Sequence, residues 1–146
     1  MATSLTFTGT LFTSASVLAT GSATTPLTIA QGGNAGCRIY GISGQTNSTT
    51  ATGYFRLSYS SSAVGGIGID IGTVPVAALA GQVAVAASDI FGQSVMASIF
   101  QKQKHANGVP YFNLAPQSIL QIRQSGSLPQ QSAGANLNII TFGEFY

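Results

Sequence analysis

Side chains that could perform acid–base or nucleophilic chemistry are few in this sequence and far apart. The acids are Asp70, Asp89 and Glu144, and the chain has a single histidine, His105, and a single cysteine, Cys37. Hydrolysis of a glycosidic bond needs two carboxylates that face the same bond, and the spacing of the three acids predicts no such pair. No set of cysteines and histidines has the spacing of a zinc site, and no acidic cluster suits calcium. The sequence therefore predicts no catalytic residue, no metal ligand and no cofactor, and a protein that is not an enzyme.

The two remaining reactive groups have ordinary structural interpretations. Cys37 lies in a largely apolar stretch, which favours a small buried hydrophobe over a nucleophile paired with His105. As the only cysteine, it also excludes a disulfide within the chain. Lys102, Lys104 and His105 form the one cationic cluster, which is either a contact for a small anion or, as we favour, the solvated end of a helix.

The composition narrows the class of protein further. Only 5% of the 146 residues are charged, the net charge is +2, and 45% are hydrophobic. Disordered chains have the opposite balance, and a nucleic-acid surface needs clustered lysine and arginine. No apolar run approaches the length of a membrane-spanning helix. We therefore expect one domain with a true core that binds neither nucleic acid nor membrane.

The start of the chain lacks the basic and apolar regions of a secretory signal, so we expect the protein to be made in a cytoplasm. Asn47-Ser48-Thr49 matches the N-glycosylation pattern, and without such a signal we interpret it as a turn.

Short alternation of apolar and polar residues, interrupted by Gly, Ser, Asn and Pro, dominates the chain and predicts an all-β sandwich or barrel of about eight strands. The predicted strands are 5–8, 27–29, 37–42, 54–59, 67–71, 83–85, 119–123 and 137–142, with polar loops at 43–52, 60–66 and 126–134. Pro110 and Pro116 flank residues 111–114, which fits an edge strand or a connection.

One segment has helical rather than strand spacing. Its apolar residues lie at 91, 95, 96, 99 and 100, and Ser88 and Asp89 suit a helix start. This predicts one short helix at about 89–101, although Gly92 weakens it by about 1 kcal/mol.

So few charges leave a β-rich surface poorly protected against association, because charged side chains normally shield exposed strand edges. Burial in a symmetric oligomer removes this problem. The aromatic C-terminus, residues 142–146, either completes the core or contacts another subunit, and both alternatives stay open. The candidate contact residues are Phe7, Phe12, Tyr111, Phe145 and Tyr146.

The order of motifs in roughly the last 60 residues resembles that of a known class of proteins. The motifs run from Asp89–Phe100 through Asn107–Tyr111 and Leu114–Arg123 to the closing segment Leu137–Tyr146, which ends in aromatic and acidic residues. This order resembles the small jelly-roll virion proteins of tailed bacteriophages, the capsid cement or decoration proteins. The sequence departs from that pattern at Gln117-Ser118, where we expect a turn that contains glycine.

The resemblance implies a jelly-roll sandwich over residues 26–146, preceded by residues 1–25 as either a first strand or an extended arm. It also implies a homotrimer located in the virion, on the outside of an icosahedral head, that ties neighbouring copies of the major capsid protein together. The alternative is a lectin-like β-sandwich of a phage surface that binds carbohydrate, since jelly rolls also form lectins. Tyr40, Tyr54 and Tyr111 are then the available stacking residues.

Overall fold

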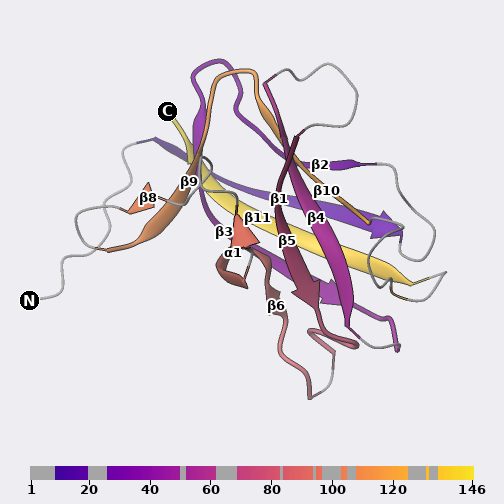
Figure 1. Cartoon of the computed structure of the whole chain (residues 1–146). Helices are drawn as coiled ribbons and strands as arrows, with labels where there is room; N and C mark the ends of the chain where they lie inside the picture. Colours follow the sequence, from indigo (N-terminus) through magenta and orange to yellow (C-terminus); the bar gives the residue numbers. More distant parts are fainter. Residues whose placement is uncertain are drawn as a thin grey trace, which may run out of the picture.

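The computed structural model is an all-β sandwich of two antiparallel sheets, which confirms the predicted fold class (Figure 1). It describes residues 9–19, 26–49, 52–61, 69–82, 84–93, 95–96, 103–104, 108–124, 131 and 135–146. The first sheet contains β1 (Thr10–Ala19), β11 (Asn136–Phe145), β3 (Cys37–Thr46), β9 (Pro110–Leu114) and β8 (Gln103–Lys104) in that order, and β6 (Ser88–Asp89) also pairs with β3. The second contains β2 (Leu27–Gln31), β10 (Ile119–Gln124), β4 (Gly53–Ser60), β5 (Ile69–Val76) and β7 (Val95–Met96).

The strand pairing has the nested pattern of a jelly roll. The chain pairs β1 with β11, β2 with β10, β3 with β9, and β4 with β5, always antiparallel. This is one long antiparallel ribbon, and folding it over brings β11 beside β3 and β10 beside β4. The result is two four-stranded sheets, as in jelly rolls generally. The eight strands of the ribbon match the predicted number, and β6, β7 and β8 are two-residue additions at their margins.

The core lies between the two sheets and follows from the alternation in the sequence. In β11, Leu137 and Ile139 are buried whereas Ile140 is 46% exposed. The other large apolar side chains with almost no exposed surface include Phe55, Ile29, Ile39, Leu57, Ile71, Ile90, Leu114 and Ile122. Cys37 is fully buried, which confirms its prediction as a small core hydrophobe, and burial raises the pKa of its thiol to about 11.

A β-bulge interrupts the pairing of β3 with β11 and corrects the predicted alternation there. The register shifts between Phe142 and Gly143, and Tyr40 is the extra residue on β3 with no residue opposite. Consequently Ile39 and Ile42 both face the core, although strict alternation predicts that they lie on opposite sides. The sequence carries no signal for this change of phase, because the bulge depends on the partner strand.

The predicted helix at 89–101 is wrong, except for one turn, in the part of that segment that the structure describes, and residues 94 and 97–101 lie outside the described residues. The structure has α1 only at Ile90–Gln93, Asp89 belongs to β6, and Val95–Met96 forms β7 against the margin of β5. Ile90 and Phe91 are buried in the core. Core packing thus accounts for the apolar residues Ile90 and Phe91 without a continuous helix.

Two further boundaries are corrected. The predicted strand at 83–85 is wrong, because Val85 lies in a turn where its carbonyl accepts a hydrogen bond from the Gly81 amide at 2.8 Å. The predicted loop at 43–52 is wrong in its first part, because β3 continues to Thr46.

Several predictions concern residues at the limits of the described structure. The predicted strand at 5–8, together with Lys102 and His105 of the cationic cluster, lies outside the described residues. Lys104 lies in β8. Residues 10–19 of the predicted N-terminal segment form β1, a strand that the sequence alternation did not predict.

The turn at Gln117 explains the departure from the expected glycine. The Ser118 amide donates to the Ala115 carbonyl at 3.1 Å, and Gln117 has the left-handed φ of 59° that glycine adopts most easily. The Gln117 amide donates to the Gly33 carbonyl at 2.8 Å, and its side chain donates to Asn34 Oδ1 at 3.0 Å. These contacts with the neighbouring loop hold a non-glycine residue in this conformation.

The two glycines at the bulge, Gly143 and Gly41, differ in whether a side chain would fit. A Cβ on Gly143 would lie 2.3 Å from the Arg38 carbonyl oxygen and 2.7 Å from the Phe12 ring, whereas a Cβ on Gly41 meets nothing within 4 Å. We expect Gly143→Ala to lower the free energy of unfolding by about 2 kcal/mol or more, because backbone must shift. Gly41→Ala is the matched control and should change it by less than about 1 kcal/mol. Urea denaturation measures both, and equal losses would contradict the bulge geometry.

Candidate functional site

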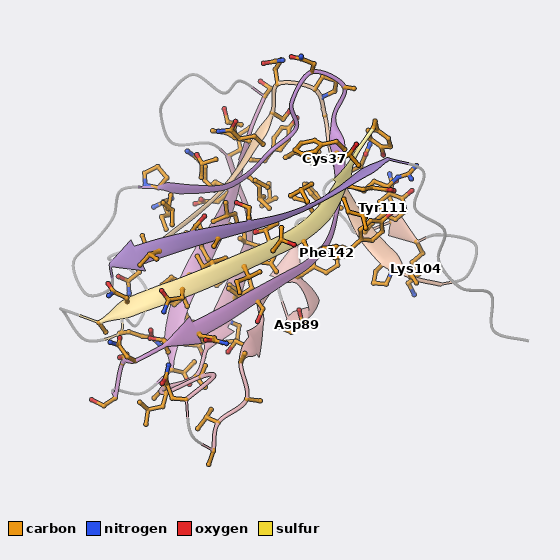
Figure 2. All side chains as sticks on the ribbon, turned by 180° about the vertical axis from the view of Figure 1, so that it is seen from behind. Cys37, Asp89, Lys104, Tyr111 and Phe142 are labelled. Atoms are coloured by element: carbon orange, nitrogen blue, oxygen red, sulfur yellow. The ribbon has the colours of Figure 1, made fainter. Side chains whose placement is uncertain are left out.

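Three exposed large apolar side chains lie on the side of the first sheet that faces away from the core. We call this surface, formed by β1, β11, β3 and β9, the outer face. Leu11 and Val17 of β1 are 48% and 57% exposed, and Ile140 of β11 is 46% exposed. In the strand register Ala15 lies beside Ile140, which lies beside Ser43, so the apolar residues are interleaved with small uncharged ones. Figure 2 looks onto this side of the sheet, with β1, β11 and β3 next to one another.

The second sheet carries an exposed group of charged side chains. Arg123 Nη2 of β10 donates to both carboxylate oxygens of Asp70 on β5, at 3.1 and 2.9 Å. Arg56 Nη1 of β4 lies 3.9 Å from the same carboxylate. Three of the chain's eight charged residues thus meet on the second sheet, whereas Arg38, Glu144 and Asp89 belong to the first sheet.

One end of the outer face holds a buried carboxylate. Glu144 is only 1% exposed, and its Oε1 accepts hydrogen bonds from Tyr40 OH at 2.7 Å and Arg38 Nη1 at 3.1 Å. Its Oε2 accepts from the Gly9 amide at 3.1 Å, where the chain enters β1. Burial raises the pKa of Glu144, but the hydrogen bonds from Tyr40, Gly9 and Arg38 outweigh it, and the pKa lies below its usual value.

Aromatic rings surround the arginine of this cluster. The Arg38 guanidinium lies over the Tyr146 ring at 4.7 Å and near the Tyr111 ring at 5.3 Å, within the range of cation–π attraction. The Tyr40 ring continues the row, 6.4 Å from Tyr111 and 6.1 Å from Phe142. Burial and the hydrogen bond to the nearby Glu144 carboxylate raise the pKa of Tyr40 to about 12. In Figure 2 the labelled Phe142 and Tyr111 lie on this side of the sheet.

The structure brings four of the five predicted contact residues to this end of the sandwich. Tyr111 and Tyr146 flank Arg38. Phe12 and Phe145 stack with their ring centroids 4.5 Å apart, and both are partly buried against the core. Phe7 lies outside the described residues. The carboxylate cluster was missed by sequence reasoning, because Glu144 is more than 100 positions from Arg38 and Tyr40, and only strand pairing joins them.

Two hollows adjoin these residues. The first has a volume of about 290 Å³ and lies between β1 and β2, lined by Phe12, Ser14, Thr28, Ile29, Ala30, Gln31 and Phe145. The second has a volume of about 270 Å³ and lies on the outer face, lined by Gly41, Ile42, Ser43, Ala87, Asp89, Ile140 and Phe142. Both hollows combine apolar carbon with polar groups, which are hydroxyl and amide groups in the first and the Ser43 hydroxyl and Asp89 carboxylate in the second, and this mixture suits the side chains of another protein.

The three tyrosines proposed for sugar stacking do not all lie on one surface. Tyr40 and Tyr111 lie in the first sheet, and Tyr54 lies in β4 of the second. Among the described residues, no group of three or more His, Cys, Asp or Glu side chains is placed to hold a metal ion. The described part of the chain also has no helix long and apolar enough to cross a membrane.

Comparison of the chain with known protein families, with curated proteins and with solved structures finds no match. The chemistry of its two surfaces is therefore the basis for assigning a role.

The Glu144 cluster should make the folded chain less stable as the pH falls. Because the pKa of Glu144 is lower in the folded chain than its usual 4.5, the ionised form stabilises the fold above that pH. This stabilisation is lost as the pH falls below 4.5 and through the folded-state pKa. We expect Glu144→Gln to lower the free energy of unfolding by about 1–3 kcal/mol at pH 7.

Urea denaturation at pH 7 and at pH 3 measures this effect. The difference between the wild type and Glu144→Gln should shrink at the lower pH, because the wild-type carboxyl is then increasingly protonated. A difference that stays the same at both pH values would show that the charge of Glu144 is not what stabilises the cluster.

Proposed function

We propose that this chain is a structural virion protein, a capsid cement protein that binds the outside of an icosahedral phage head as a homotrimer. It stabilises the contacts between neighbouring major capsid proteins. The observation that carries this proposal is the outer face of the first sheet, where Leu11, Val17 and Ile140 are exposed among small uncharged residues. It is supported by the resemblance of the last 60 residues to the cement proteins of tailed phages.

The outer face has the chemistry of a protein interface. Leu11, Val17 and Ile140 expose apolar surface on this face, and the centres of protein interfaces are apolar and depleted in lysine, glutamate and aspartate. Aromatic and arginine side chains are the residues that contribute most to such contacts. Arg38, Tyr111 and Tyr146 supply them at one end of the outer face.

A cement function also makes use of the rigidity of the fold. The jelly roll fixes the outer face on four paired strands, so a partner binds a surface that is already formed. A trimer presents three such surfaces at once, and each weak contact with the shell then benefits from a high effective concentration. Reinforcement of this kind opposes the outward pressure of packaged DNA without any catalytic group.

Carbohydrate binding remains the alternative, and Tyr40 and Tyr111 are the observation that favours it. These two half-buried rings lie 6.4 Å apart on the first sheet. A glycan array separates the two functions, since specific hits together with no binding to heads would favour the lectin.

The proposal predicts unequal effects of the same substitution on the two sheets. Ile140→Lys places an ammonium group on the outer face and should weaken co-sedimentation with empty heads that lack the protein by at least about tenfold. Ile69, which is 68% exposed on β5 of the second sheet, provides the matched control, and Ile69→Lys should bind as the wild type does. Failure of the wild-type chain to bind heads, or equal loss in both variants, would contradict the proposal.

A further inference from the structure

Three edges of the two sheets carry features that discourage pairing with another chain. The β5 edge contains Asp70 and Pro75 and is partly covered by β7. The opposite edge of the first sheet ends in the two residues of β8, with Lys104 facing Pro110. The β2 edge is only five residues long, and its pairing with β10 is irregular. Charge, proline, short length and bulges are the usual means by which proteins protect sheet edges.

The fourth edge, β1, has none of these features. It is ten residues long, contains no charged residue and no proline, and pairs with β11 without a register shift from Thr10 to Ala19. Within the described residues β11 is its only hydrogen-bonded neighbour, and Figure 2 shows β1 at the margin of the sheet. A long, regular, uncharged edge of this kind is a template for a further strand.

We infer that β1 pairs with β1 of a second copy of this chain, antiparallel, about a twofold axis at Ser14. Residues directly opposite in an antiparallel pair lie on the same side of the sheet, so each register is defined by which exposed residues meet. With Ser14 opposite Ser14, Leu11 of one copy faces Val17 of the other, twice. This register covers the two exposed large apolar side chains of β1, which are 48% and 57% exposed in the single chain.

The other side of the strand also fits this register. Phe12 of one copy faces Ser16 of the other, so a large ring meets a small side chain. The hollow of about 290 Å³ beside Phe12 and Ser14 leaves room for the approaching strand. The strand itself has no charge, and pairing it with a copy of itself therefore brings no like charges together.

This twofold contact goes beyond the proposed cement function and does not depend on it. The shell contacts of that proposal involve the outer face as a whole, whereas the pair forms through the backbone at the β1 edge and uses Leu11 and Val17 only along that margin. On a shell, such pairing would join copies from adjacent trimers. In solution it gives even-numbered assemblies, which distinguish it from a trimer.

Two double variants test the pairing and its register in the full chain. Leu11→Lys with Val17→Lys places two ammonium groups opposite each other twice and should raise the dimer Kd at least about tenfold, as measured by sedimentation. Leu11→Lys with Val17→Glu is the matched control, because it places opposite charges across the same axis and should retain the dimer. Circular dichroism shows whether both variants are folded. Equal weakening in both folded variants would overturn the inference.

A cysteine cross-link tests the axis independently. Ser14→Cys should form a covalent dimer on mild oxidation, because Cα atoms directly opposite in an antiparallel pair are about 4.5–5.5 Å apart and suit a disulfide. Thr13→Cys is the control and should not, because it would face Ala15 of the other copy. Absence of the Ser14→Cys dimer, or stronger cross-linking at position 13, would overturn the inference. A trimer that still binds heads would leave the cement proposal standing in that case.

Discussion

The pairing of β1 with β11 closes the ribbon from which the fold is built. Ten residues near each end of the chain lie opposite one another in continuous register, and the three inner pairs of the jelly roll are nested within this one. The same pairing brings Glu144 of β11 beside Gly9 at the entrance to β1, with Arg38 on the other side. The outer face and its buried carboxylate therefore both depend on the two ends of the chain coming together.

The placement of the few charged residues gives the two sheets different properties. Asp70 on the second sheet is bound by Arg123 and approached by Arg56, whereas the carboxylate of the first sheet is buried and its partner Arg38 is stacked between tyrosines. Away from that cluster, β1 carries no charged residue and exposes Leu11 and Val17, and Asp89 lies beside the outer-face hollow that Ile140 lines. The uncharged strand β1 and the exposed apolar side chains of this sheet are the features on which the proposed protein contacts rest.

The sequence predicted the parts of the fold that show strong local alternation. The strands at 54–59, 119–123 and 137–142 have large apolar residues on one side, and their burial follows from that pattern. In contrast, the four large apolar residues of β1 come as the adjacent pairs Leu11-Phe12 and Val17-Leu18, separated by threonine, serine and alanine, so the strand shows no alternation of apolar and polar residues. The bulge at Tyr40 and the cluster at Glu144 depend on a partner strand about 100 residues away. Local spacing contains no information about such pairs. It also does not show that the helix ends after one turn, because the pairing of β7 with β5 is a contact with a distant strand.

The central claim is that this chain strengthens a shell through the surface of its first sheet. Its most direct test is the temperature at which DNA-filled heads release their DNA, compared between heads that carry the protein and heads that lack it. We predict release at a lower temperature when the protein is absent, and recovery when the wild-type chain is added back. Heads that withstand heating equally well with and without it would contradict the account.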